Sequence, residues 1–358
     1  PSPESMRGNL PWLNRSIQWP GGAVSRTAPG DGISVAEISV ATLLGLSQPL
    51  GRVLFCAARL AEMHVNARDG RVVGELAHLT NDFRFQLRPY PTNSTIAGGV
   101  AAFEAALATH HADCLLGAQF SSISAAVASR SRGLPQVCPT SSSDYLSDKA
   151  LYPGFARTHP TNAQAAQALV TLLRTSFWSW SAIGIVSVSD AYGSSYAQGI
   201  REAVTTHGRG MRLVASVPFM PNDVESMSRA MDRLYGSGVS VVVCISHEDD
   251  LAALLARAGE LLANDFAWIV VDAADDVVAR VEAGEMSAAY ARHLNGMLAF
   301  QFDTKPRHED STPRMALEAV YREAGPSLGC SSTGELPSYA PLVYDAVAAL
   351  AIAVNNSV

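Results

Sequence analysis

Residues 118–162 read AQFSSISAAVASRSRGLPQVCPTSSSDYLSDKALYPGFARTHPTN, and the interpretation of the whole chain depends on this stretch. Ser121 and Ser122 open a helical segment, residues 134–138 form a short apolar strand, and residues 140–143 form a hydroxyl-rich loop. In open α/β sheets, ligands bind outside the carboxyl ends of strands and beside helix N-termini, which offer free N–H groups. The two hydroxyl clusters therefore predict a seat for a small anion such as a carboxylate. Ser and Thr are also the commonest caps and loop residues, so a purely structural role stays open.

Strands and helices alternate on both sides of this stretch. Before it, strands are expected over 33–41, 83–87 and 113–117, with helices over 51–67 and 95–109. After Pro160, helices are expected over 161–177, 192–207, 224–235, 250–262, 314–324 and 338–355, with strands over 180–188, 213–219, 239–245, 268–271 and 298–302. Such alternation predicts mostly parallel sheets with helices on both faces, arranged as two successive units.

Several short motifs then occur in a fixed order. They are Ser121-Ser122, Leu134-Pro135-Gln136, Thr140 to Ser143, Leu146-Ser147-Asp148-Lys149, Phe155-Ala156-Arg157 and Pro160. In this order they resemble the extracellular ligand-binding region of family C G-protein-coupled receptors and receptor guanylate cyclases. The resemblance implies a periplasmic-binding-protein-like type I fold, in which two Rossmann-like α/β lobes with parallel sheets are joined by a hinge.

The resemblance also implies a domain order. We expect an irregular N-terminal extension over 1–32, lobe 1 over 33–158, lobe 2 over 159–299 and a return to lobe 1 over 300–358. The C-terminal part of the family domain is then expected to be absent from the chain.

The resemblance implies a ligand site that can be carried over residue by residue. Ser121 matches a serine that meets a ligand carboxylate, and Thr140 and Ser142 match residues that bind the carboxylate and the amino group. Tyr192 matches a tyrosine that lies against the ligand, and Asp272 matches an acid that pairs with its ammonium. Hydroxyls suit a carboxylate, while a carboxylate and a tyrosine ring suit an ammonium.

The chain departs from the family pattern at Asn162, where amino-acid-binding members carry an acid. A neutral amide still accepts a hydrogen bond but neutralises no charge. Structural roles stay open as well: Asn162 suits a helix cap, Asp272 could cap the following helix, and Tyr192 could pack at a helix start.

Composition and motifs exclude several classes of protein. Net charge is -7 and no basic run occurs, so nucleic acid is a poor partner. No apolar segment reaches the roughly 20 residues of a bilayer span. Adjacent His110 and His111 lack a third metal ligand nearby, and residues 247–250 are expected to form a solvated loop. Dinucleotide, P-loop and nucleophile-elbow patterns fail, so we expect no enzyme activity, no metal and no cofactor.

The five cysteines leave the redox compartment open. Cys114, Cys138 and Cys244 lie in apolar strand-like runs, where cysteine behaves as a small buried hydrophobe. Cys56 lies in a helical pattern, and Cys330 lies in a loop from which it could pair beyond the chain end. Three sequons, at Asn14, Asn93 and Asn355, permit a glycosylated, secreted protein.

These observations predict an extracellular ligand-binding domain that closes on a small amino-acid-like ligand in the cleft between the lobes. It would belong to a membrane protein whose span lies outside this chain, or be secreted, and would form a homo- or heterodimer through lobe 1. Two alternatives stay open: a peptide-binding ectodomain like that of receptor cyclases, and an assembly module that has lost ligand binding.

Overall fold

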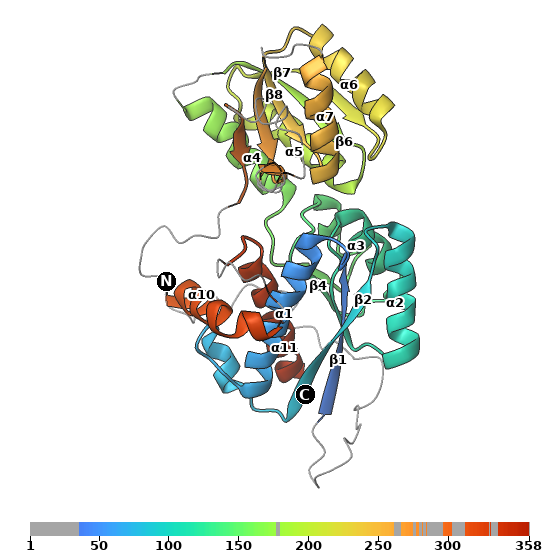
Figure 1. Cartoon of the computed structure of the whole chain (residues 1–358), viewed down its shortest axis with the longest axis vertical. Coiled ribbons are helices and arrows are strands. Elements are labelled where there is room, and N and C mark those ends of the chain that lie inside the picture. The colour runs from blue at the N-terminus through green and yellow to red at the C-terminus, as the bar shows by residue number, and fades with distance from the viewer. Residues whose placement is uncertain are drawn as a thin grey trace. The chain divides into compact units, whose positions relative to one another are not determined.

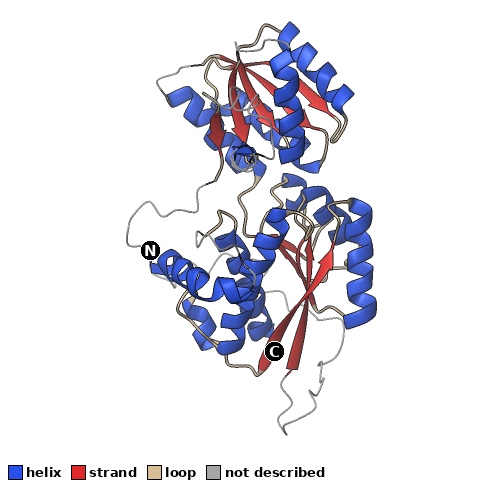
Figure 2. Cartoon of the chain, in the orientation of Figure 1, coloured by secondary structure: helices blue, strands red, loops and turns tan. Residues whose placement is uncertain are grey.

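A computed structural model describes a large part of the chain (Figures 1 and 2). The described residues are 36–176, 180–260, 266–302 with gaps at 275–276, 279–280, 282–283 and 285–295, 312–328, 330 and 336–357. The extension expected over 1–32 and the Asn14 sequon lie outside them. Contacts divide the chain into a first unit, Pro1–Gly117, Arg130–Pro139 and Pro306–Val358, and a second unit, Ala118–Ser129 and Thr140–Lys305.

The first sheet has five strands in the order β2-β1-β3-β4-β5. They are β1 (Ala36–Leu44), β2 (Phe83–Pro91), β3 (Cys114–Gly117), β4 (Gln136–Cys138) and β5 (Phe155–Arg157). β1 pairs in parallel with β2 and β3, and β3 with β4. Helices α1 (Pro49–Ala67) and α11 (Ala340–Ser357) cover one face, and α2 (Ile96–His110) covers the other (Figure 1).

The core of the first unit joins the two ends of the chain. Leu54 and Leu60 of α1 and Val347 and Leu350 of α11 are fully or almost fully buried in one cluster with strand residues such as Val40. Helix α10 (Thr312–Ala324) and the short 3-10 helix η2 (Gly74–His78) add to this layer. The C-terminal segment therefore packs with the N-terminal helix rather than forming a domain of its own.

The second sheet also has five parallel strands, in the order β10-β9-β8-β6-β7. They are β6 (Ala182–Val188), β7 (Arg212–Phe219), β8 (Val241–Ile245), β9 (Ala267–Val271) and β10 (Leu298–Phe300). The helices are α4 (Asn162–Thr175), α5 (Ala191–His207), α6 (Val224–Gly236) and α7 (Glu248–Glu260). α4 packs on α5 over one face, and α6 and α7 cover the other (Figure 1).

The inner strands of the second sheet, β6, β8 and β9, are almost entirely buried and apolar, as expected for a parallel sheet covered on both sides. All five residues of β8 are buried, and so are six of the seven residues of β6. Numbered from its own first strand, each sheet has the same order, 2-1-3-4-5, which is a common order for doubly wound sheets. Two parallel α/β sheets confirm the predicted fold class.

The predicted elements are present with small shifts at their ends. The sequence interpretation missed β5, a strand of only three residues, and it extended α3 (Ser121–Ala128) to Gly133 although the helix ends five residues earlier. The segment before β5 contains a second short 3-10 helix, η3 (Asp144–Ser147). Short elements of this kind lie below the length at which periodicity is informative.

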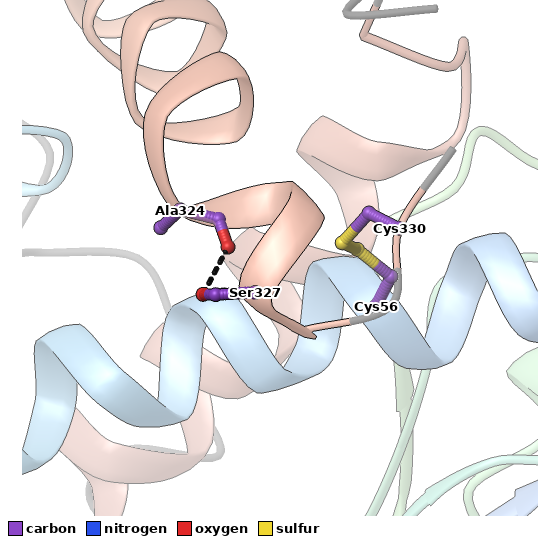
Figure 3. Close-up of a disulfide and its surroundings, with 4 residues drawn as sticks. All are labelled: Cys56, Ala324, Ser327 and Cys330. Atoms are coloured by element: carbon purple, nitrogen blue, oxygen red, sulfur yellow. Dashed lines mark hydrogen bonds between the residues drawn. A yellow bond between two sulfur atoms is a disulfide. The ribbon is translucent and has the colours of Figure 1, made fainter. Parts of the chain in front are cut away.

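A disulfide joins Cys56 to Cys330, with the two Cα atoms 5.5 Å apart (Figure 3). Cys56 lies on α1, and Cys330 follows the 3-10 helix η4 (Gly325–Leu328), where the Ser327 hydroxyl donates to the Ala324 carbonyl (2.7 Å). The sequence left the pairing of Cys330 open, including a partner beyond the chain end, and the structure places that partner 274 residues earlier in the same chain. Cys114, Cys138 and Cys244 are buried, as predicted, and none of the three forms a disulfide.

Candidate ligand-binding site

The carboxyl ends of β6 and β8 lie side by side, because the two strands pair from Gly184 with Val242 to Ser187 with Ile245. β7 adjoins β6 on its other side and β9 adjoins β8, so the chain leaves the two strands in opposite directions. Open α/β sheets place their ligand sites at such a switch point. The residues that follow β6 and β8 therefore lie where a ligand site is expected.

The hydroxyl loop, residues 140–143, lies beside the start of α3. The Ser121 hydroxyl accepts the backbone N–H of Ser143 (3.3 Å), which leaves its own proton available for donation. The Thr140 hydroxyl donates to the Gln119 carbonyl (2.7 Å), so its oxygen is left as an acceptor. The Ser142 hydroxyl makes no hydrogen bond among the described residues, and the buried Ser143 hydroxyl makes none there either. Of the hydroxyls singled out from the sequence, Ser121 and Ser142 are therefore the best able to donate to an anion.

Buried hydrogen bonds hold the loop in place. The Ser124 hydroxyl contacts both the N–H and the carbonyl of Ala118 (3.0 Å each) and the Ser141 hydroxyl (2.9 Å). The Arg157 guanidinium donates to the Ser143 carbonyl (2.7 Å). These contacts fix the backbone of the loop without using the Ser142 side chain.

Asp144 connects the loop to two helices of the second unit. Its carboxylate accepts the Ser195 hydroxyl of α5 (3.0 Å) and the backbone N–H of Ala163 at the start of α4 (2.9 Å). In return, the Asp144 N–H donates to the Ser195 hydroxyl (2.9 Å). The carboxylate thus lies at the positive end of the α4 dipole, where a negative charge is stabilising.

Asn162 is not the helix cap that one reading of the sequence proposed. Thr161 caps α4 through a reciprocal capping box with Gln164, and Asn162 is the first helical residue. Its backbone N–H donates to the Ser142 carbonyl (2.9 Å), and its side-chain amide donates to the Tyr192 carbonyl (3.0 Å). The side-chain oxygen Oδ1 is buried with no hydrogen-bond partner among the described residues. A buried acceptor without a donor is unfavourable unless another molecule supplies one.

The phenol end of the Tyr192 side chain contacts Asp272. The Tyr192 hydroxyl donates to Asp272 Oδ2 (3.0 Å), while Asp272 Oδ1 has no hydrogen-bond partner among the described residues. Burial raises the pKa of Asp272 to about 6 although the Tyr192 hydrogen bond lowers it, and the nearby charge of Glu248 raises it further. Asp272 directly follows β9, and its backbone adopts the left-handed conformation (φ 62°). This conformation is uncommon for residues other than glycine, and residues that adopt it cluster at functional sites.

His247 follows β8 and lies between two aromatic rings. Its Nε2 contacts Asp190 Oδ2 (2.9 Å), and its ring lies against Tyr192 (centroids 5.6 Å apart, planes at 30°) and edge-on to Phe120 (5.1 Å, 83°). Asp190 also caps α5 by accepting the Gly193 N–H (2.8 Å). Only glycine permits this close start, because a Cβ at Gly193 would lie 2.0 Å from the carbonyl oxygen that ends β6.

The surroundings of His247 favour its charged form. Burial alone lowers the pKa of the imidazole, but the hydrogen bond and charge of Asp190, together with the charges of Glu248 and Asp250, raise it above its usual value. Asp250 is itself buried and accepts the Asn222 N–H (2.8 Å). The solvated loop expected over 247–250 is therefore wrong: Glu248 begins α7, and Asp250 is 3% exposed.

All six residues singled out from the sequence lie in the second unit, and contacts connect them. The series runs through Ser121, the 140–143 loop with Thr140 and Ser142, Asn162, Tyr192 and Asp272. Sequence reasoning missed Asp190 and His247, which are 57 residues apart and each follow an apolar strand. Their position directly after two apolar strands was the sequence signal that could have identified them as site residues.

No group of three or more His, Cys, Asp or Glu side chains is arranged to hold a metal ion within the described part of the chain. None of the helices described there combines the length and apolarity of a membrane span.

Comparison with known proteins assigns the family. Residues 55–358, well over half of the chain, match the family model "Receptor family ligand binding region". The chain is 32% identical to the human protein "Taste receptor type 1 member 1" over 114 residues, which are 32% of this chain and 13% of that protein. It is 28% identical to the "Metabotropic glutamate receptor" of Drosophila melanogaster over 170 residues, 44% of this chain and 16% of that protein.

The matched segments thus span under a fifth of either relative. The family model describes a ligand-binding region and not an enzyme, which confirms both the resemblance and the expectation that the chain is not an enzyme. The chain belongs to the receptor family ligand binding region, the family of the ligand-binding regions of family C receptors.

Proposed function

We propose that the chain is the extracellular ligand-binding region of a receptor, and that it binds a small amino-acid-like ligand at the polar cluster around Tyr192. One observation carries the proposal. Asn162, whose amide donates to the Tyr192 carbonyl, has a buried Oδ1 without a donor among the described residues, and the Asp272 carboxylate makes no hydrogen bond there other than the one from the Tyr192 hydroxyl. An ammonium group supplies several N–H donors and a positive charge.

The ammonium end of the ligand is assigned to Asp272 and Tyr192. With a pKa of about 6, Asp272 is mostly ionised at pH 7, so it can pair with a cation. The Tyr192 ring offers a second attraction for the cation. Asn162 contributes an oxygen without charge, so Asp272 is the charged partner on which affinity depends.

The carboxylate end is assigned to the hydroxyl loop. Ser121 and Ser142 have hydroxyl protons to donate, and Ser121 stands at the N-terminus of α3, whose free N–H groups favour an anion. Thr140 is assigned a weaker role, since its proton is directed at the Gln119 carbonyl.

We extend the proposal to the behaviour of the receptor. A ligand that binds a closed form more tightly than an open one would favour closure, because a ligand shifts a conformational equilibrium only through its differential affinity for the two states. Dimerisation through the first lobe, a location on the extracellular side and the domain boundaries at 158 and 299 belong to the same proposal.

Glycosylation is assigned to Asn93 among the sequons within the described residues. Asn93 is exposed in the turn before α2. Asn355, in contrast, uses its side-chain oxygen to accept the N–H groups of Thr80 (2.9 Å) and Asn81 (3.1 Å). Enzymatic deglycosylation of protein from a secreting host should reduce the mass of the wild type by one glycan more than that of Asn93→Gln.

Calorimetry with a panel of amino acids tests the proposed function. A ligand of the panel should raise the melting temperature by the amount that corresponds to RT ln(1+[L]/Kd). Combined Ser142→Ala and Asp272→Ala substitutions should abolish that increase. A shift that survives in the double variant would place the ligand elsewhere, and a folded wild type that binds no member of the panel would overturn the proposal.

Loss of ligand binding is the second candidate, with a role in assembly only. Asn162 favours it, because the amide removes one of the two acids of amino-acid-binding members. The calorimetric panel separates the candidates, since an assembly module binds none of the ligands while it still associates with a partner chain.

A further inference from the structure

Asp144 bonds to segments that carry both ends of the proposed site. The residue directly follows the hydroxyl loop, residues 140–143, in which Ser142 is assigned to the ligand carboxylate. Its carboxylate oxygen Oδ2 accepts the backbone N–H of Ala163 (2.9 Å), the residue after Asn162, which is assigned to the ligand ammonium. The Asp144 side chain therefore joins the segments that carry the two groups of ligand contacts.

A second set of contacts fixes Asp144 to α5. The Ser195 hydroxyl accepts the Asp144 N–H (2.9 Å) and donates to the Asp144 carboxylate (3.0 Å). Ser195 is buried and lies on the same helix as Tyr192. Because one partner holds both the backbone and the side chain of Asp144, the residue has little freedom to move relative to α5.

The first turn of α4 directs its free N–H groups at this part of the chain. The Asn162 N–H donates to the Ser142 carbonyl (2.9 Å), and the Ala163 N–H donates to Asp144. Such N–H groups have no partner within their helix, and the helix dipole favours an anion beside them. Asp144 supplies that anion itself, so the start of α4 is closed to the ligand carboxylate.

We propose that Asp144 is a positioning residue, which holds the hydroxyl loop against the starts of α4 and α5 and so sets the spacing between Ser142 and Asn162. The inference rests on the proposed function, in which these two residues contact opposite ends of one ligand. Contacts that are held in place before the ligand arrives increase affinity, because less conformational freedom is lost on binding. Asp144 itself is assigned no contact with the ligand.

Isothermal titration calorimetry tests the assignment, with the twenty standard amino acids as probes and the one that binds the wild type most tightly carried forward. Asp144→Ala should raise the Kd of that amino acid about tenfold, which corresponds to the loss of a charge-assisted hydrogen bond. Asp144→Asn should stay within about threefold of the wild type, because an amide oxygen can accept both bonds that Oδ2 accepts. Ser195→Ala keeps the contact with Ala163 and should raise the Kd about threefold.

A double substitution distinguishes positioning from a general loss of stability. If Asp144 acts through the hydroxyl loop, its effect should shrink once the Ser142 hydroxyl is absent. In a Ser142→Ala background, Asp144→Ala should therefore raise the Kd by less than about threefold, whereas independent effects would multiply. If Asp144→Ala does not fold, Ser195→Ala in the same background decides, and its effect should likewise be smaller than in the wild type.

Hydrogen exchange measured by NMR gives a readout that needs no ligand. The N–H groups of Asn162 and Ala163 both donate to the segment that Asp144 holds, so both should exchange faster in Asp144→Ala, or in Ser195→Ala if the former does not fold. Unchanged exchange at both positions would show that Asp144 does not hold the loop at α4, and would overturn the inference.

Asp223→Ala is the matched control. Asp223 caps α6 of the same unit by accepting the Ser226 N–H (3.0 Å), so its loss should lower the melting temperature but leave the Kd within about twofold. Wild-type affinity in folded Asp144→Ala, or a full loss of affinity that persists in the Ser142→Ala background, would overturn the inference and leave the proposed function standing. A folded wild type that binds none of the twenty amino acids would overturn both.

Discussion

The two sheets share one topology but use their polar side chains in different places. In the first unit, hydrogen bonds join a helix to a strand and one helix to another along the body of the fold: Glu62 accepts the Leu87 N–H (2.8 Å), and His64 contacts the Tyr344 hydroxyl (2.6 Å). In the second unit, Asp190, Tyr192 and Asp272 concentrate at the carboxyl ends of strands. One strand order can therefore support a cross-linked frame in one unit and a binding site in the other. The binding site is recognised by the positions of its polar side chains.

Stability should differ between the units in a corresponding way. The first unit has a disulfide and paired polar contacts between segments more than 250 residues apart in sequence. In the second unit, Asp272 has a raised pKa, and Asn162 has a buried acceptor without a donor. Such groups oppose folding unless a ligand pairs with them.

Removal of the disulfide should have the largest effect and should be confined to the first unit. Combined Cys56→Ser and Cys330→Ser substitutions should lower its free energy of unfolding by about 2–4 kcal/mol, since the cross-link restricts the unfolded chain. Hydrogen exchange detected by mass spectrometry resolves the two units. Protection should fall in α1 and α11 and persist in β6 and β8; an equal loss in both would show that the units do not differ as described.

Stability of the second unit should depend weakly on pH between about 4 and 6.5, because two groups oppose each other. The folded pKa of Asp272 is raised to about 6, so its contribution to stability is full below the unfolded value of 3.8 and is lost as pH rises through 6. Burial lowers the pKa of His159 to about 4, so its contribution is full above 6.5 and is lost as pH falls through 4. Each contribution is at most about 3 kcal/mol.

Single substitutions should expose the two opposing contributions. In Asp272→Asn, the urea midpoint of the second unit should fall from pH 6.5 to 4, because the His159 contribution is no longer offset by that of Asp272. In His159→Phe, which keeps a ring against Phe302, the midpoint should rise over the same interval. Parallel pH profiles in the two variants would show that these groups do not control the pH dependence.

Two buried tyrosines provide the smallest and most closely matched comparison. Tyr344→Phe removes the partner of a buried histidine nitrogen and should destabilise the first unit by about 1–2 kcal/mol. Tyr196 is 1% exposed, and its hydroxyl has no hydrogen-bond partner among the described residues. Tyr196→Phe should therefore change stability by less than about 0.5 kcal/mol or increase it. Equal losses, measured by chemical denaturation, would contradict the assignment of these two environments.

The sequence was sufficient to predict most of the fold. Strands such as Val241–Ile245 are apolar runs bounded by polar residues, and α5 begins with an Asp cap, so local patterns locate them. β5 was missed because three residues have no measurable period. The partner of Cys330 could not be predicted, because nothing in the local sequence indicates a cysteine 274 residues away.

The candidate site was only partly predictable. Its six residues came from the resemblance to a family, and the hydroxyls alone are compatible with caps and loops. Local reasoning placed His247 in a solvated loop because three acids follow it, whereas Asp190, Tyr192 and Phe120 surround it in the fold. Whether residues that follow two different strands are in contact depends on the order of the strands in the sheet. The local sequence around Asp190 and His247 does not reveal that order.

Thermal melting of Asp272→Asn at pH 7.5, with and without a saturating amino acid that stabilises the wild type, tests the central claim most directly. Without ligand, the variant should melt above the wild type, because it has lost a buried carboxylate that opposes folding. With ligand at about 100 times the wild-type Kd, the wild type should gain about 2.7 kcal/mol and the variant almost nothing. A variant that melts below the wild type and still gains stability from the ligand would contradict the claim that this strand-end acid is kept for binding.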